Sequence, residues 1–425
     1  MSISGNSKTK YYTSVLILLI IIYIITVFYF PAVGTVYVAG DGDGDFNCDG
    51  KDDHIQINQA LELVAENSDY TTVHLKGPFT YVINDTLLIG NNTILEGDSN
   101  AVIKLVDDAG WPAHKGIIQP RKESAHEITI QGFEIDGNVQ AQPVPRGEHY
   151  YTVMLLDGCT NVTVRDMYIH NSSNDGIRVL NRVYTEGSGN IDIYNNRFYR
   201  CCHNGVYLTK VSNANIYNNT FIPRTNDGIT ITDSNHISIH DNKIDSGIPT
   251  GGCGVEIQKT VSVPAMDDIE IYGNNISNTN LAGILVNGYN SYPVPSGAQN
   301  VYIHHNIISG CGQHMGLSTY FGGGINVQGF NNTTIENNFI DGCYHDGISM
   351  KNVWLVPPKY TYNTIIRDNI VTNTLPGRLI SGSGHGINIY DISMYTVSLE
   401  TNNVWNNSAG NYLNITESTS VSDGE

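Results

Sequence analysis

The sequence has few charged residues and little positive charge. Only 15% of its 425 residues are charged, and 22 Lys and Arg stand against 41 Asp and Glu, which gives a formal net charge of −19. This balance argues against nucleic acid or an anionic membrane surface as a general partner. It leaves an anionic polysaccharide open, because a local basic patch can override the global sign. Gly, Asn, Ile and Tyr are plentiful instead, a composition typical of an all-β protein with many tight turns.

Cysteine is scarce and carries no metal-binding pattern. No CxxC spacing and no Cys/His cluster indicates a zinc site. The count is odd, so at least one cysteine is unpaired or pairs between chains. The plainer interpretation is that they are small buried residues at turns. The seven are Cys48, Cys159, Cys201, Cys202, Cys253, Cys311 and Cys343.

One long hydrophobic run occurs, and it lies near the N-terminus. Tyr11–Phe30 contains no charge and follows Lys8 and Lys10. About 20 apolar residues suffice to span a bilayer, and the basic flank places the N-terminus in the cytoplasm. The alternative is a signal peptide cut near "PAVG". The length of the run favours an anchor, and both interpretations place residues 35–425 outside the cell, at the cell surface or secreted.

A repeated phrase dominates the rest of the chain. A strand is followed by an Asn, an apolar residue, a variable turn, and Gly-Ile or Gly-Val opening the next strand, as in "IYNNRF", "IYNNTF", "IHDNKI" and "IYGNNI". Successive copies are 23 to 33 residues apart. The Asn of each copy is, in order, Asn196, Asn219, Asn242, Asn274, Asn306, Asn338, Asn369 and Asn402.

This period predicts an all-β fold, a single-stranded right-handed parallel β-helix. About three short strands fit each repeat, and stacked coils lie ~4.8 Å apart. Residues at one position of the repeat then form a ladder, and Asn suits an inward turn because its amide both donates and accepts. A leucine-rich horseshoe is the main rival, but the repeat is not dominated by leucine and has no helical side.

The domain organisation follows from the repeat. Residues 1–34 hold the basic tip and the anchor or signal peptide, residues 35–415 form the β-helix, and residues 416–425 are a polar tail. Residues 35–100 supply the N-terminal cap and first coils, and 101–415 the regular coils. Within the cap, apolar spacing predicts one amphipathic helix that closes the open first coil. Its apolar residues are Ile55, Ile57, Ala60, Leu61, Leu63 and Val64.

The cap carries a family resemblance. "DGKDD", the helix pattern and "FTYVI" resemble the N-terminal signature of the pectate-lyase superfamily. The phrases "VYVAGDGDGDFNCDGKDDHIQINQAL" and "HLKGPFTYVI" are similar to the disaggregatase-related proteins of methanogenic archaea. That resemblance implies a β-helix over about residues 35–415 and a link to cleavage of methanochondroitin, the chondroitin-like matrix that holds cells in aggregates.

Alternation along the Gly-opened strands predicts which side chains point outward. The first outward row is Arg178, Tyr207, Thr230, Glu256, Leu285, Asn326, Ser349 and Asn388. Polar and charged groups gather between residues 175 and 259, and superfamily members bind glycans across this face. Asp175 and Asp227 precede their glycines two coils apart, so their backbones should be about 9.6 Å apart.

That spacing predicts an acid–base site. Two carboxylates roughly 6.5 to 9.5 Å apart hydrolyse glycosides with inversion, one as acid and one as base. The predicted catalytic residues are Asp175, Asp227 and, in the coil between, His203. The predicted substrate-binding residues are Arg178, Asn204, Tyr207, Lys210, Arg224, Glu256 and Lys259. The basic residues among them could pair with uronate carboxylates.

Alternatives remain open at every residue. Asp-Gly and Asn-Gly are common turn dipeptides, so Asp175 and Asp227 have a purely structural interpretation. Glu256 taken alone fits a solvated charge or the ion-pair partner of a neighbouring coil. "TNDGITI" and "GHGINI" resemble phrases of polygalacturonases, with Asp227 and His385 at the matching positions, but "GGCGVEI" replaces the expected Asp-Asp coil. A polygalacturonase mechanism is therefore in doubt.

Three functions compete. The first is a glycoside hydrolase acting on an extracellular acidic polysaccharide. The second is a uronate lyase of the same fold, with a His, Tyr or Lys base and an Arg that neutralises the carboxylate. The third is a non-catalytic surface protein that binds glycan with the same face. No cofactor is required for any of them.

Calcium is the one metal the sequence allows. The segment "DGDGDFNCDGKDD" has an oxygen-rich alternation like that of calcium loops, but Phe46 and Asp52 stand where an EF-hand has Gly and Glu. An acidic turn before the cap helix is the alternative. The candidate ligands are Asp41, Asp43, Asp45, Asn47 and Asp49.

Overall fold

The computed structural model describes residues 34–143, 151–181, 189–222, 226–246, 251–260, 266–288, 299–313, 322–351, 362–377, 383–390, 395–413 and 421–422. The hydrophobic run Tyr11–Phe30, the predicted ligand Arg224 and most of the tail 416–425 lie outside these residues. Among the residues described, no helix is long and apolar enough to cross a membrane.

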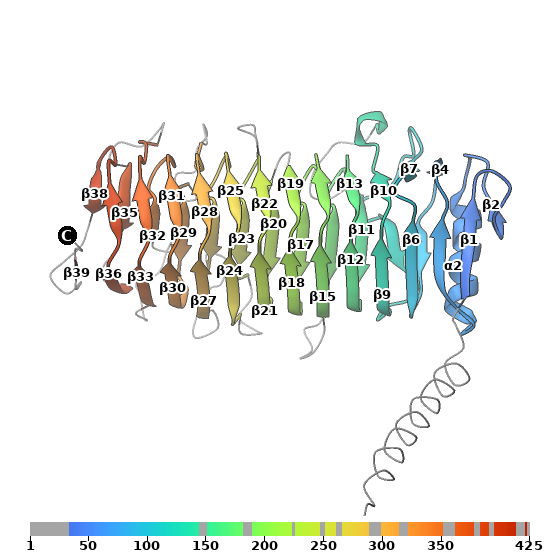
Figure 1. Ribbon diagram of the computed structural model, residues 1–425, viewed down its shortest axis with the longest axis horizontal. Coiled ribbons are helices and arrows are strands. Elements are labelled where there is room, and N and C mark those ends of the chain that lie inside the picture. Colours follow the sequence, from blue (N-terminus) through green and yellow to red (C-terminus); the bar gives the residue numbers. More distant parts are fainter. Residues whose placement is uncertain are drawn as a thin grey trace, which may run out of the picture.

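Three parallel sheets run side by side along one elongated solenoid (Figure 1). In spatial order the first sheet contains β2 (Phe46–Asn47), β1 (Gly34–Ala39), β3 (Tyr70–Leu75), β6 (Thr93–Gly97), β9 (His126–Gln131), β12 (Thr160–Arg165), β15 (Gly189–Tyr194), β18 (Ser212–Tyr217), β21 (Asn235–His240), β24 (Ile269–Tyr272), β27 (Gln299–His304), β30 (Asn331–Glu336), β33 (Tyr362–Arg367), β36 (Tyr395–Glu400) and β39 (Val421–Ser422).

The other two sheets contain the remaining strands of each coil. The second sheet contains β37 (Asn403–Trp405), β34 (Ile370–Thr372), β31 (Phe339–Asp341), β28 (Ile307–Ser309), β25 (Asn275–Ser277), β22 (Lys243–Asp245), β19 (Thr220–Ile222), β16 (Arg197–Tyr199), β13 (Tyr168–His170), β10 (Glu134–Asp136), β7 (Ala101–Leu105) and β4 (Phe79–Ile83). The third sheet contains β38 (Gly410–Leu413), β35 (His385–Ile389), β32 (Ile348–Lys351), β29 (Ile325–Gln328), β26 (Ile284–Asn287), β23 (Val255–Gln258), β20 (Ile229–Thr232), β17 (Val206–Thr209), β14 (Ile177–Leu180), β11 (Thr152–Asp157), β8 (Gly116–Pro120) and β5 (Leu87–Ile89).

The cap helix is α2 (His54–Glu66), at the N-terminal end of the solenoid (Figure 1). Ile57, Ala60, Leu61 and Val64 are its buried residues, at the spacing of one helix face. Ile55, which the sequence also counted on that face, is 49% exposed. A 3-10 turn, η1, spans Val139–Ala141.

The predicted Asn ladder is present. The side-chain oxygen of Asn274 accepts hydrogen bonds from the backbone and side-chain nitrogens of Asn242, each at 3.0 Å. The Asn274 amide in turn donates to the carbonyl of Ile239 at 2.9 Å and to Asn306 at 3.0 Å. The same bonds link the neighbouring ladder residues from Asn196 to Asn402.

The residue before each ladder Asn explains the Asn-rich phrase. It adopts a left-handed backbone in every repeat, with φ between 52° and 63°, and this conformation favours Gly, Asn and Asp. These residues are Asn195, Asn218, Asp241, Gly273, His305, Asn337, Asp368 and Thr401. One position therefore turns the chain and the next bonds to the coil beside it.

Asn274→Ala is expected to lower the free energy of unfolding by at least about 3 kcal/mol. It leaves several buried donors and acceptors without partners, at about 1–3 kcal/mol each. Asn275→Ala is the matched control, because Asn275 is the next residue and its side chain is exposed. Chemical denaturation measures both. Equal, small losses in the two variants would contradict a stabilising role for the ladder.

All seven cysteines lie in the part of the chain that is described, and each is buried, with no disulfide between any two of them. The odd count predicted at least one cysteine that is unpaired or pairs between chains, and pairing between chains stays a prediction. Most of them occur in the apolar core, where thiols pack as small hydrophobic groups.

Candidate functional site

Strand register confirms that the residues of the predicted outward row are aligned on successive coils of the third sheet. Arg178 pairs with Tyr207, Tyr207 with Thr230, and Thr230 with Glu256. The row continues through Leu285, Asn326, Ser349 and Asn388. Each step is one coil, about 4.8 Å. Side chains far apart in the chain therefore share one face.

The residues before the strand-opening glycines have a structural role. Oδ1 of Asp175 accepts the backbone N–H of Asn204 at 3.0 Å, and Oδ1 of Asn204 accepts that of Asp227 at 3.2 Å. Oδ1 of Asp227 accepts the N–H of Cys253. A Cβ on Gly228 would lie 2.8 Å from the Gly254 carbonyl, so the coils approach too closely there for a side chain. One oxygen of each Asp therefore joins two coils.

The second function of Asp175 is to hold two groups that lie nearer the surface. Its Oδ1 is 2.8 Å from Nδ1 of His203, and its Oδ2 accepts Nη1 of Arg178 at 3.4 Å. A neutral imidazole that donates its Nδ1–H to this carboxylate keeps a lone pair on Nε2. The side chain of Asp175 is fully buried, whereas those of His203 and Arg178 are 17% and 16% exposed. The guanidinium carbon also lies 4.6 Å from the ring centre of Tyr207.

Asp227 and Glu256 form a pair of carboxyl groups in contact. The two side chains hydrogen-bond to each other, and Oγ1 of Thr230 donates to Oδ2 of Asp227 at 2.9 Å. Burial, followed by the neighbouring charge of Asp227, raises the pKa of Glu256 to about 8. Burial also raises the pKa of Asp227. Two carboxyl groups in contact cannot both ionise at neutral pH, so they hold one proton between them.

Asp175, Asp227, His203 and Glu256 differ in how deeply they are buried, and this difference indicates their roles. Asp175 and Asp227 are 0% and 1% exposed, while His203 and Glu256 are only partly buried and lie above them. His203 and Glu256 lie two coils apart, about 9.6 Å at the usual strand spacing. The charge of a protonated His203 acts on Glu256 across this gap and lowers its pKa. The arrangement therefore presents an imidazole and a carboxyl group on one face, each positioned by a buried Asp.

The other predicted ligands are placed differently. Asn204 is buried, where its side chain bridges the coils of Asp175 and Asp227. Lys210 is the residue directly after β17, three residues beyond Tyr207, and its backbone is left-handed, with φ of 55°. Lys259 is 0% exposed, and its Nζ lies 3.3 Å from Oδ1 of Asp233, in a buried ion pair. The Lys259 ammonium is thus committed to the fold and does not face the solvent side of the sheet.

A hollow of about 340 Å³ adjoins Arg178 on the N-terminal side of this cluster. It offers hydroxyl, amide, carboxylate and imidazole groups to a ligand. Its lining residues are His114, Gln119, Thr152, Leu155, Asp157, Asn174, Arg178 and Leu180. Because Arg178 lines both the hollow and the cluster, one extended ligand could contact the two.

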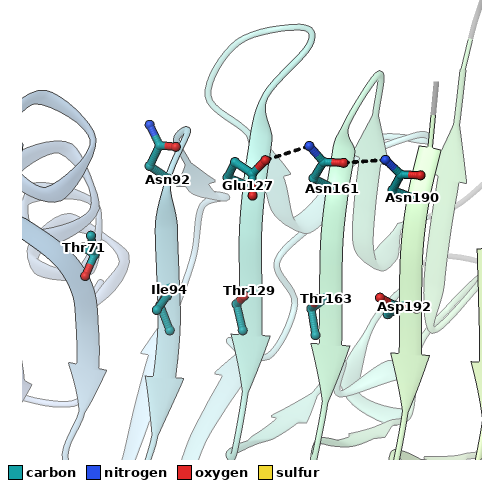
Figure 2. Close-up of a pocket in the computed structure, with 9 residues that line it drawn as sticks. All are labelled: Thr71, Asn92, Ile94, Glu127, Thr129, Asn161, Thr163, Asn190 and Asp192. Carbon is teal, nitrogen blue, oxygen red and sulfur yellow. Dashed lines mark hydrogen bonds between the residues drawn. The ribbon is translucent and has the colours of Figure 1, made fainter. Parts of the chain in front are cut away.

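A second groove, of about 750 Å³, lies on the first sheet. Figure 2 shows Glu127, Asn161 and Asn190 in line across its rim, joined by hydrogen bonds of 2.7 and 2.8 Å. Asp192, the other carboxylate, accepts the side-chain amide of Asn215 at 3.0 Å. Both acidic groups are thus tied to amides of adjacent coils, and none of the described residues that line the groove is basic. This chemistry suits structure or weak binding better than acid–base catalysis.

The acidic N-terminal segment forms turns. Oδ2 of Asp45 accepts the N–H of Tyr37 at 2.8 Å, and Oδ1 of Asn47 accepts that of Gly44 at 3.0 Å. Oδ2 of Asp43 lies 3.1 Å from Nζ of Lys76. Among the residues described, no three His, Cys, Asp or Glu side chains converge as metal ligands would. The calcium hypothesis stays a prediction.

Comparison with known proteins gives the class of the fold. Residues 117–294 match the family described as "Right handed beta helix region". Solved structures with the same fold include the A-module of the Azotobacter vinelandii mannuronan C-5 epimerase AlgE4, with 16% identity, a TM-score of 0.60, and coverage of 91% of this chain and 100% of that one. The endo-xylogalacturonan hydrolase of Aspergillus tubingensis has 14% identity, a TM-score of 0.56, and coverage of 92% and 99%.

The Dettilon tailspike protein is a third structure of this kind, with 15% identity, a TM-score of 0.58, and coverage of 89% of this chain and 68% of that one. At these identities the likeness concerns the fold alone. No curated protein sequence matches the chain. Residues 266–424 match the family described as "Disaggregatase related". The chain thus has the fold of a right-handed parallel β-helix, and its residues 266–424 are similar to the disaggregatase-related family.

Proposed function

We propose that this protein is a glycoside hydrolase that cleaves an extracellular acidic polysaccharide of the chondroitin-like class. The observation that carries the proposal is the Asp227–Glu256 pair, in which the pKa of Glu256 is raised to about 8, on the same face as the Asp175-held imidazole of His203 and two coils from it. The named substrates of two structural neighbours, mannuronan and xylogalacturonan, are uronate polymers, and the disaggregatase-related match agrees with a matrix polymer.

In the proposed chemistry the partly buried His203 and Glu256 act on the substrate, and the fully buried Asp175 and Asp227 position them. Glu256 donates its proton to the glycosidic oxygen as the bond to the sugar breaks. His203 takes a proton through Nε2 from the attacking water, and the Asp175 carboxylate stabilises the resulting imidazolium, as in other Asp–His pairs. Arg178 would hold a uronate carboxylate. Asp175 and Asp227 are then positioning residues, in place of the acid and base that their coil spacing suggested.

One arrangement favours β-elimination as the second candidate. His203 and Arg178 share Asp175, which places a base beside a cation able to neutralise a uronate carboxylate. In that reaction His203 would remove the proton next to the carboxylate, and Glu256 would protonate the leaving oxygen. Incubating the purified protein with a chondroitin-like polymer separates the candidates. New reducing ends without ultraviolet absorption indicate hydrolysis, absorbing products indicate a lyase, and no new ends would overturn both.

The pH dependence of cleavage is expected to report Glu256. Because the neutral acid is the active form, kcat/KM should fall as pH rises through about 8. Asp227→Asn removes the negative charge that raises this pKa, so the same fall should occur at lower pH. Glu270→Gln, in β24 of the first sheet, should leave the profile unchanged. Coincident profiles for wild type and Asp227→Asn would contradict the role given to the pair.

We propose that the site works outside the cell, with the hydrophobic N-terminal run as its membrane tether. The support is the sequence of that run and its basic flank.

A further inference from the structure

The outward row of the third sheet carries a second polar cluster. After Glu256 the row passes Leu285, which packs with Cys253 and Ala282 in a small apolar patch. It then continues as Asn326, Ser349 and Asn388 on successive coils, all 0% exposed. Ser349 is three coils beyond Glu256, about 14 Å at the usual strand spacing.

Lys351 and Tyr390 lie beside this row. Lys351 ends β32, is 4% exposed, and places Nζ 4.9 Å from the ring centre of Tyr390, which is 42% exposed. Burial lowers the pKa of Lys351 to about 8, although the nearby Asp346 opposes the change. A buried ammonium of this kind gains most from an anion that reaches it.

Asp346 organises the cluster. Its Oδ2 accepts the Tyr390 hydroxyl at 2.7 Å and the Asn388 amide at 3.2 Å, and its Oδ1 accepts the backbone N–H of His385 at 3.1 Å. Nδ1 of His385 lies 3.4 Å from the same Oδ1. These bonds fix the positions of Tyr390 and Asn388 around Lys351.

Two buried atoms of the cluster point to a ligand. Within the part of the chain that is described, Oγ of Ser349 and Oδ1 of Asn388 have no hydrogen-bond partner. An unsatisfied buried polar atom costs about 1–3 kcal/mol, so such atoms in folded proteins find partners in water or in a ligand. Both atoms lie on the row that faces outward from the sheet.

We propose that this cluster is a second sugar-binding site for an acidic sugar unit. Lys351 would pair with the anionic group, Ser349 and Asn388 would bond to hydroxyls, and Tyr390 would offer aromatic surface to the ring. The inference deepens the proposed function and rests on it for the identity of the polymer. A chain bound along the solenoid axis would contact both sites, because they share one row.

The affinity of this cluster for an acidic sugar should depend on pH, because it depends on the protonation of Lys351. Among the residues described, the groups that face Lys351 are Asp346, Tyr390 and, from the preceding coil, Gln328, with His385 behind Asp346. An anion favours the charged amine, so affinity for an acidic sugar should fall as pH rises through about 8. Replacing Lys351 by Met should remove this dependence.

The test measures binding without cleavage. A chondroitin hexasaccharide is titrated calorimetrically into Glu256→Gln, which also removes the titration of Glu256 near the same pH. Adding Lys351→Met should weaken binding about tenfold or more, as expected for the loss of a hydrogen bond to a charged group. Lys243→Met, an exposed lysine on the second sheet, is the matched control and should leave the affinity unchanged.

The outcomes separate this inference from the proposed function. Loss of affinity with Lys351→Met, in a protein whose melting temperature is retained, supports the second site even if the wild-type protein cleaves nothing. Ser349→Ala, which removes one small group, should weaken binding in the same direction and guards against misfolding of the lysine variant. Two results would overturn the proposal. The first is that the double variant Glu256→Gln/Lys351→Met binds the hexasaccharide with an affinity within twofold of that of Glu256→Gln. The second is that Glu256→Gln itself does not bind the hexasaccharide.

Discussion

Glu256→Gln is expected to lower the rate of polysaccharide cleavage by about 10²- to 10⁴-fold, the usual contribution of a general acid. Gln keeps the size of the side chain and can still bond to Asp227 and Asn287, which contacts Glu256 at 3.2 Å in the wild type. It has no proton of suitable acidity to give to a leaving oxygen. The loss should therefore fall on kcat, with little change in KM.

The control for this variant is Glu270→Gln, which makes the same chemical change on the first sheet, where Glu270 contacts His304. It should cleave at the wild-type rate. Reducing-end release under saturating polymer measures both variants. A Glu256→Gln protein as active as Glu270→Gln would remove Glu256 from the mechanism.

His203→Ala is expected to cause the second large loss, also about 10²- to 10⁴-fold, because it removes the proposed base. Asp175→Asn should have a smaller effect. It keeps an oxygen for the N–H of Asn204 but no longer favours the Nδ1–H form of His203 or stabilises its charged state.

Comparing His203→Ala with Glu256→Gln shows whether the activity of His203→Ala is lost because the base is missing or because the protein is misfolded. Added imidazole, a base of the missing kind, should restore part of the activity of His203→Ala and none of the activity of Glu256→Gln. His236→Ala, an exposed histidine of β21, is the matched control. Rates for His203→Ala equal to those of His236→Ala would contradict the assignment.

The sequence predicted the solenoid well because the same repeat pattern occurs many times along the chain. A ladder Asn preceded by a left-handed residue recurs in eight coils, and the register of the third sheet follows from simple alternation. The cap helix was predicted for the same reason, since Ile57, Ala60, Leu61 and Val64 repeat at the helical period. These features depend on local pattern and on stacking, both of which one sequence contains.

The site was only partly predictable, because contacts between coils decide depth and partners. Asp227 and Glu256 lie in different coils, and nothing local shows that their carboxyls touch, so Glu256 taken alone resembled a surface charge. Lys259 was predicted to bind substrate, but in the structure its ammonium forms a buried ion pair with Asp233, a contact that the sequence does not reveal. Asp346 was not among the predicted site residues, although Lys351 and Tyr390 lie close to it.

The most direct test is a crystal structure of Glu256→Gln with a bound acidic oligosaccharide. The account predicts sugar lying across β14, β17, β20 and β23, with a uronate at Arg178 and a glycosidic oxygen within hydrogen-bond distance of residue 256. Sugar found only in the groove of the first sheet, or held away from His203 and residue 256, would contradict it.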